Sequence, residues 1–223
     1  MACKQEGTME LSEKIDALLS QVEKPVRYMG GEFGSVMKDL GTVDVRYAFL
    51  FPDVYEVGMS HLGMKILYHA INRMDGAWCE RVFSPWVDMD AKMREAGVPL
   101  FSLESRTPVR EFDLLGITLQ YEMCYTNILS ALDLAGIEIL ASNRKSQKTG
   151  RPHCYLRRSV RVQSGAIGAL CGCIRHGRRG RAHAENHRSV PQMARHRPSA
   201  RKIPGDACAA RRHLCALAVR YCL

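Results

Sequence analysis

The stretch VRYAFLFPDVYEVGMSHLGMKILYHAIN, residues Val45 to Asn72, decides how this chain is interpreted. Its first seven residues, 45–51, are almost entirely apolar, as expected for a strand buried on both faces of a parallel sheet. Pro52 ends that strand because it has no backbone N–H to donate to a neighbour. From Leu62 onward, apolar residues recur at helical spacing. Strand, loop and helix in this order form the first half of a βαβ unit.

The loop between this strand and helix carries the first candidate ligand-binding residues. Ligands of α/β proteins bind outside the carboxyl ends of the strands, where this loop begins. Two carboxylates and a histidine in the loop could perform acid–base chemistry. The candidates are Asp53, Glu56, Gly58, Ser60 and His61. A structural interpretation stays open for three of them, in which Ser60 caps the helix, Gly58 makes a turn and His61 is a surface residue.

A second pattern of strand, loop and helix follows further along the chain. The run LLGITLQ, residues 114–120, predicts a strand, and the helix after it has apolar residues on one face. Shorter strands are expected at 78–83, 99–103 and 137–140. Strands that alternate with helices favour an α/β fold with a doubly wound parallel sheet. The end of the strand at 114–120 supplies four further candidates, Thr118, Gln120, Tyr121 and Glu122.

Charge divides the chain near Gly150. The 223 residues have a net charge of +9, but residues 151–223 hold 16 of the 32 Lys and Arg and only 2 of the 23 Asp and Glu. This basic segment has few strongly apolar residues, a composition typical of disorder. Its arginines support an alternative function, that of a small nucleic-acid-associated protein acting through its tail. Against this alternative, only Tyr155 and Tyr221 could stack on bases there.

Several other classes of protein and site are disfavoured by the sequence. No apolar run is long enough to span a membrane and the N-terminus has no apolar signal core, so we expect a cytoplasmic protein. Nine cysteines without framework spacing favour free thiols. The first strand is not followed by GxGxxG, and there is no P-loop. The tail residues Cys171, Cys173, His176, His183 and His187 match no usual zinc-ligand spacing.

Two segments, 51–72 and 79–137, closely resemble the N-terminal part of a family of uncharacterised B12-binding-domain radical SAM proteins. They read FPDVYEVGMSHLGMKILYHAIN and CERVFSPWVDMDAKMREAGVPLFSLESRTPVREFDLLGITLQYEMCYTNILSALDLAGI. The resemblance implies an incomplete flavodoxin-like, cobalamin-binding-type domain at residues 25–143, after an N-terminal helix within residues 1–24. It also implies that a corrinoid would lie at the loop from Pro52 to Gly63 and at the strand end from Thr118 to Glu122.

The chain departs from the family pattern in two places. His61 lies in MSHLG without an aspartate two residues earlier, so the DxHxxG motif that supplies a histidine to cobalt in other B12 proteins is missing. The CxxxCxxC motif that holds the [4Fe–4S] cluster for cleavage of S-adenosylmethionine is also missing. The resemblance therefore implies the cluster and S-adenosylmethionine only for intact relatives. No catalytic residue and no metal ligand is predicted in this chain.

The basic tail, residues 144–223, is predicted to be out of frame and to lack a native fold. The relatives continue with segments like GGPC, NPEPL and GDGEE, which are not visible here. With suitable codons, a shift of one base turns HGRRGRA (His176 to Ala182) into MGDGEE, and SVRVQSGAIG (Ser159 to Gly168) into GPCVYNPEPL. One shift of constant sign serves both segments. It would also account for the excess of arginine without assigning it a role.

Overall fold

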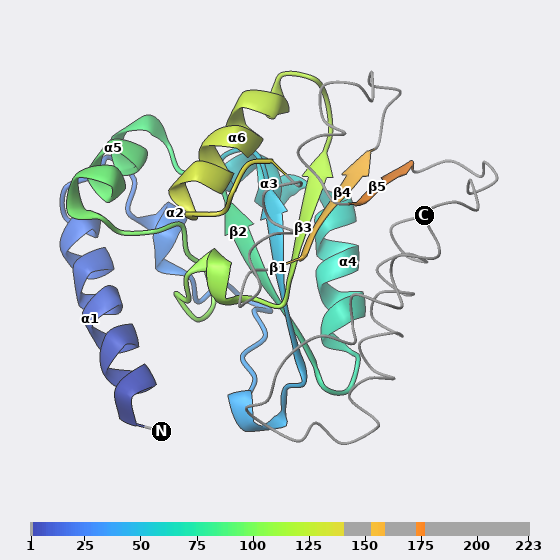
Figure 1. Cartoon of the computed structure of the whole chain (residues 1–223), viewed down its shortest axis with the longest axis horizontal. Helices are drawn as coiled ribbons and strands as arrows, with labels where there is room; N and C mark the ends of the chain where they lie inside the picture. Colours follow the sequence, from blue (N-terminus) through green and yellow to red (C-terminus); the bar gives the residue numbers. More distant parts are fainter. Residues whose placement is uncertain (1, 141–152, 159–172, 177–223) are drawn as a thin grey trace.

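The computed structural model describes residues 2–140, 153–158 and 173–176, with side chains described for residues 10–140. The strands of this part of the chain form one parallel sheet in the order β2-β1-β3-β4-β5 (Figure 1). Flavodoxin-like doubly wound sheets have the same order. The predicted α/β fold with a parallel sheet is therefore confirmed. The strands are β1 (Val45–Phe51), β2 (Ala77–Phe83), β3 (Leu114–Leu119), β4 (His153–Arg158) and β5 (Cys173–His176).

The three strands with described side chains are almost wholly buried. Every residue of β2 and β3 is buried, and in β1 only Arg46 is partly exposed. The register pairs Tyr47 of β1 with Cys79 of β2 and with Leu114 of β3. Burial on both faces explains why the strand sequences are mostly apolar without polar alternation, and the charged residues in them, Arg46, Glu80 and Arg81, are ion-paired.

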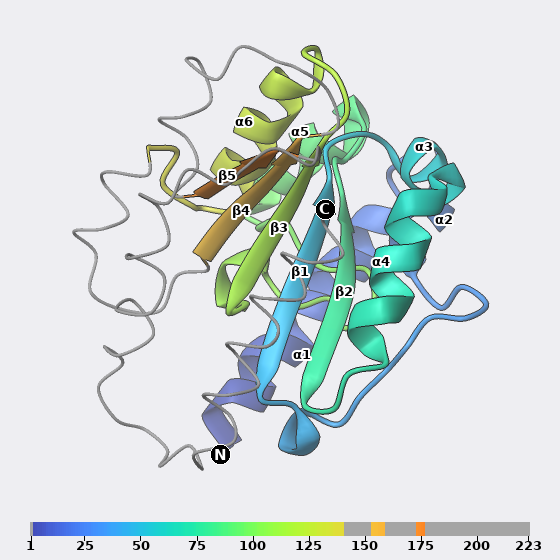
Figure 2. The same ribbon diagram turned by 90° about the vertical axis from the view of Figure 1, so that its right-hand side faces the viewer.

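Helices cover both faces of the sheet (Figure 2). On one face, α1 (Ala2–Leu19), α5 (Val87–Ala96) and α6 (Cys124–Leu134) share a core with strand residues such as Leu50 and Ile117. On the other face, α4 (Leu62–Asn72) packs through Met64 and Leu67 against Phe49 and its neighbours. Two short helices, α2 (Val26–Met29) and α3 (Tyr55–Ser60), and two 3₁₀ turns, η1 (Leu40–Thr42) and η2 (Val109–Glu111), lie in the connections.

Two of the predicted strands are wrong. Segment 99–103 forms only a single antiparallel bridge, between Phe101 and Pro108, and its last residue, Leu103, donates its amide to the carbonyl of Arg81 at 2.8 Å. Segment 137–140 is not a strand either, because its first residue, Ile137, takes part in the C-terminal cap of α6. Gly136 adopts φ 64°, and the Ile137 amide then donates to the carbonyl of Leu132 at 2.9 Å, as in a Schellman motif.

The segment predicted to be a tail without a fold supplies β4 and β5. The strand β4 pairs with β3 in parallel register, from Leu114 opposite His153 to Leu119 opposite Arg158. The remainder of residues 144–223 lies outside the described residues. The side chains of the five residues considered as zinc ligands, Cys171, Cys173, His176, His183 and His187, are also outside the description. The prediction of an out-of-frame tail therefore stays a prediction.

Candidate functional site

The carboxyl ends of β1 and β3 lie side by side where the strand order of the sheet reverses direction. In open α/β sheets, the connections that leave such a pair of strands diverge to opposite faces and leave a crevice that binds ligands. Here β1 runs into Pro52 and Asp53, and β3 runs into Gln120 and Tyr121. We call this strand-end position between β1 and β3 the crevice, after its place in the topology; residues that the sequence predicted to be ligand-binding border it.

Asp53 and Tyr121 meet across this crevice. The Tyr121 hydroxyl donates to Oδ2 of Asp53 at 3.0 Å, and Oδ1 of the same carboxylate accepts the amide of Val54 at 2.8 Å. The hydrogen bond to Asp53, helped by the nearby Cys124, raises the pKa of Tyr121 to about 12. Tyr121 is thus a neutral hydrogen-bonding group over the whole physiological pH range. Two predicted site residues, distant in sequence, are brought into contact.

Asn127 makes a second connection across the crevice. Its Nδ2 donates to the carbonyl of Pro52 at 3.0 Å, which ties α6 to the end of β1. Sequence reasoning missed this residue, because an asparagine inside an amphipathic helix carries no local signal of a long-range contact. The loop after β1 is therefore fixed to the loop after β3 through Asp53 and Pro52.

Three buried hydroxyl groups at this edge have no hydrogen-bond partner among the described residues. They are Oγ1 of Thr118 in β3, Oγ of Ser84 just after β2, and the hydroxyl of Tyr125 in the first turn of α6. Thr118 is only 4% exposed. Because buried polar groups are nearly always paired, orphaned hydroxyls at a ligand-binding edge suit a bound polar molecule or ordered water. Thr118 is a predicted site residue; Ser84 and Tyr125 are additions.

Glu56 does not face the crevice as a free acid. It lies in α3, where its carboxylate pairs with Arg27 at 2.8 Å and with Lys24 at 3.8 Å. The hydrogen bond from Arg27 lowers the pKa of Glu56. The Arg27 guanidinium also lies over the ring of Trp86, 5.4 Å from its centroid. Glu56 therefore joins α3 to the segment around α2, which crosses near the end of β2.

The two glycines predicted at this site have a role in packing. A Cβ added to Gly58 would lie 2.2 Å from Cε1 of Phe83, so only glycine lets α3 approach the end of β2. A Cβ added to Gly63 would lie 2.9 Å from Cε1 of His61. Gly58 thus has a structural role, but not the turn that was expected: it lies within α3 and permits close packing.

The expected cap of α4 is corrected by one residue. Ser60 was predicted as the cap, but its hydroxyl donates to the carbonyl of Val57 at 2.8 Å within α3. The N-cap is His61, whose Nδ1 accepts the amide of Met64 at 3.2 Å. The His61 ring also packs against Phe51, with 5.3 Å between centroids. The short helix α3, which the sequence did not predict, occupies Ser60 and leaves His61 to begin α4.

The last two predicted residues, Gln120 and Glu122, flank Tyr121 directly after β3. Gln120 is half-buried directly after β3, and Glu122 is exposed beside Tyr121. The carbonyl of Glu122 accepts the amide of Tyr125 at 3.1 Å at the start of α6. Both residues therefore lie at the edge where the sequence placed them.

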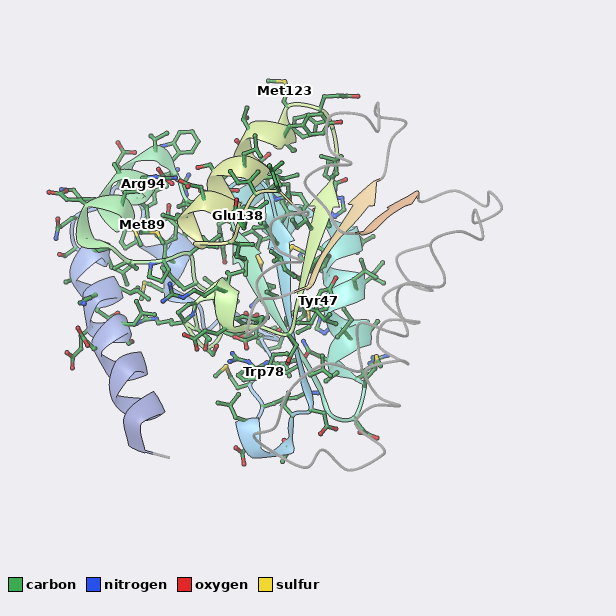
Figure 3. The ribbon with its side chains drawn as sticks, in the orientation of Figure 1. Tyr47, Trp78, Met89, Arg94, Met123 and Glu138 are labelled. Atoms are coloured by element: carbon green, nitrogen blue, oxygen red, sulfur yellow. The ribbon has the colours of Figure 1, made fainter. Side chains whose placement is uncertain are left out.

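Exposed apolar side chains surround this edge, and we call them the apolar rim. Each follows the carboxyl end of a strand and stands near the start of a helix. Met123 and Val87 are the most exposed, at 79% and 73%. Figure 3 shows Met123 at the outer end of the molecule, beyond β3. Exposed apolar side chains near one edge of the sheet are compatible with a surface for a ligand or partner. The rim comprises Val57, Leu62, Trp86, Val87, Tyr121 and Met123.

The described residues contain no group of three or more His, Cys, Asp and Glu side chains arranged to hold a metal ion. In the same part of the chain, no helix is both long and apolar enough to cross a membrane.

Comparison with known proteins relates the chain to radical SAM proteins. Residues 63–152 match the family model described as radical SAM proteins, N-terminal. The matched segment begins in α4 and includes β2, β3 and α6, with the strand end that carries Thr118 and Tyr121. No curated protein and no solved structure gave a match. S-adenosylmethionine and an iron–sulfur cluster are accordingly the cofactors expected of intact relatives.

Proposed function

We propose that this chain is built on the N-terminal domain of a radical SAM protein and holds a corrinoid at the carboxyl edge of its sheet. The family match at residues 63–152 supports the first part. The observation that carries the second is Oγ1 of Thr118, next to last in β3, which is buried without a hydrogen-bond partner among the described residues. A ligand at this strand end that reaches the hydroxyl would pair it.

The chemistry of the edge suits a corrinoid. A corrin ring is broad and apolar, with amide groups on its periphery. The apolar rim offers a surface to the ring, while the hydroxyls of Thr118 and Ser84 offer hydrogen bonds to amides. His61 uses Nδ1 to cap α4, and the chain lacks the DxHxxG motif, so we propose a site without a histidine ligand to cobalt. When bound, the corrinoid would supply its cobalt chemistry next to the radical SAM chemistry of an intact relative.

The apolar rim also suits a surface that faces a second domain. In this proposal the α/β domain orients the bound cofactor, while a radical SAM domain of an intact relative supplies the cluster and S-adenosylmethionine. The paired Glu56 and Arg27 beside the rim would keep α3 in place without presenting an unpaired charge to that domain.

A spectroscopic titration tests the corrinoid site. Hydroxocobalamin added to the full chain should give a saturable shift in the visible absorption of the corrinoid. Thr118→Val, which keeps the shape and removes the hydroxyl, should weaken the apparent affinity by about three- to tenfold. Thr42→Val removes a hydroxyl from η1, far from the crevice, and should leave the titration unchanged. Absence of any saturable shift would reject the corrinoid and leave the family match standing.

We also propose that the basic tail, residues 144–223, is read out of frame beyond the end of the family match at residue 152. The family match stops at residue 152, close to the point where the charge of the chain changes sign. Sequencing the coding DNA tests this directly. The shifted frame should encode GDGEE after residue 150, and stop codons in that frame would require the tail to be treated as native protein.

A further inference from the structure

The edge strand β2 is covered along its open side. It ends the sheet order, with only β1 beside it, and yet all seven of its residues are buried. In a parallel strand, alternate residues direct their backbone N–H and C=O groups to opposite sides. In β2 the residues that point away from β1 alternate from Ala77 to Phe83, and the hydrogen bonds of Ala77, Cys79 and Arg81 show what covers this side. An exposed row of such groups would be a template for pairing with another chain.

Asn72 acts as a substitute for a neighbouring strand. Its Oδ1 accepts the amide of Cys79 at 2.9 Å, and its Nδ2 donates to the carbonyl of the same residue at 3.0 Å. A residue of a paired strand would make the same two bonds through its backbone. Asn72 is the last residue of α4 and is buried, so the helix on one face of the sheet delivers the amide to the edge.

Two further segments complete the cover. Lys38 donates from Nζ to the carbonyl of Ala77 at 2.6 Å and also to the carbonyls of Asn72 and Met74. Glu104 accepts the Arg81 amide through Oε2 at 2.7 Å, and the Leu103 amide donates to the Arg81 carbonyl at 2.8 Å. The amide of Ala77 donates to the carbonyl of Met74 at 3.4 Å. Each outward backbone group of Ala77, Cys79 and Arg81 therefore has a partner.

The segments that supply this cover are fixed by contacts of their own. Trp78 Nε1 donates to the carbonyl of Val36, and the Val36 amide donates to the Tyr68 hydroxyl. Glu104 is also ion-paired with Arg81 through Oε1 at 2.6 Å. Figure 2 shows β2 as the outermost strand on the side of α4, with the segment that precedes β1 running past it. The cover is thus a preformed part of the domain.

We infer that Lys38, Asn72 and Glu104 close the β2 edge against strand addition by another copy of this chain. Asn72 is the critical member because it alone pairs both the donor and the acceptor of one residue. Removing its amide would take two hydrogen bonds away from the backbone of Cys79 at the edge, and a second β2 edge could replace both. The inference concerns self-association and is independent of any bound cofactor.

Sedimentation of the full-length Asn72→Leu variant over a range of concentrations tests this inference. Leucine has a similar size but cannot hydrogen-bond, so we expect self-association at concentrations about tenfold lower than for the unsubstituted chain. The matched control is Asn127→Leu, which removes an asparagine from the opposite side of β1. It should leave self-association unchanged.

A second comparison separates edge exposure from general loss of stability. Leu132→Ala removes a buried core side chain and should destabilise the fold without exposing β2. If Leu132→Ala associates as strongly as Asn72→Leu at matched unfolding free energy, the inference is overturned. Amide hydrogen exchange adds a local readout, because the Cys79 amide should exchange faster in Asn72→Leu while the amides of β3 keep their rates. Unchanged exchange at Cys79 would also contradict the inference.

Discussion

At the scale of single residues, the role of each carboxylate near the crevice is set by its hydrogen-bond or ion-pair partner. The same carboxylate chemistry gives Asp53 and Glu56 different roles. Asp53 bridges to Tyr121 across the strand ends, whereas Glu56 is neutralised by Arg27 and holds α3. Neither behaves as an unpaired acid. The earlier expectation of acid–base work by two carboxylates and His61 therefore finds no support in the contacts of the described residues.

The titration of Tyr121 gives a prediction at this scale. Its pKa is raised to about 12 by the bond to Asp53, so the folded state retains the phenolic proton more strongly than the unfolded state. The contribution of this bond to folding should be fully present below the ordinary tyrosine pKa of about 10 and should be lost as the pH rises through about 12.

The phenolate absorption is recorded as a function of pH for the unsubstituted chain and for Tyr121→Phe. Because the chain has eight tyrosines, the difference between the two curves isolates the titration of Tyr121. Asp53→Asn removes the charge of the acceptor and should lower the pKa of Tyr121 toward its ordinary value. An unchanged titration in Asp53→Asn would show that the hydrogen bond does not set the pKa.

At the scale of elements, a buried polar network joins β1, β2 and the loop 102–107. Glu80 is 0% exposed and pairs with Arg46, whose guanidinium lies over the rings of Trp78 and Phe112. Ser102 and Ser105 donate to the other Glu80 oxygen. Arg106 in the same loop adopts φ 54°, and its guanidinium reaches Asp16 of α1 at 2.6 Å. One loop therefore connects the sheet to α1.

Substitution of Glu80 tests how strongly this network holds the elements together. Glu80→Ala leaves the Arg46 charge among apolar rings without its partner, so we expect the unfolding free energy to fall by about 3–5 kcal/mol. Urea denaturation followed by circular dichroism measures the change. The double variant Arg46→Met with Glu80→Leu should recover most of the loss, because it removes both buried charges together. A loss below about 1 kcal/mol in the single variant would contradict this role.

At the scale of the whole molecule, the α/β domain has two distinct edges, the strand ends at which we propose a cofactor and the covered side of β2. The apolar rim lies at the carboxyl ends of the strands, whereas the outward side of β2 is closed by Lys38, Asn72 and Glu104. We therefore expect partners to approach along the strand ends. A second domain of an intact relative would meet the ligand site and the rim at the same surface.

The absence of CxxxCxxC from the sequence gives the prediction at this scale. Anaerobic reconstitution of the full chain with iron and sulfide should leave it without a stoichiometric [4Fe–4S] cluster, because three cysteines at that spacing are needed to hold one in radical SAM proteins. Visible absorption and iron analysis after desalting measure the outcome. A stoichiometric cluster that survives desalting would show that other cysteines of this chain form a cluster site.

The sequence by itself determined the α/β class, the positions of β1, β2 and β3, and the edge at which Asp53, Thr118 and Tyr121 lie. These follow from local patterns, since buried parallel strands are apolar runs and ligands bind at strand ends. Only the tertiary structure decided which polar groups pair. Asn127 reaches Pro52, His61 replaces Ser60 as a cap, and Asn72 closes the β2 edge, all through contacts that depend on how the chain packs. Local sequence periodicity records which face of an element is buried, but a hydrogen bond between distant residues leaves no such pattern.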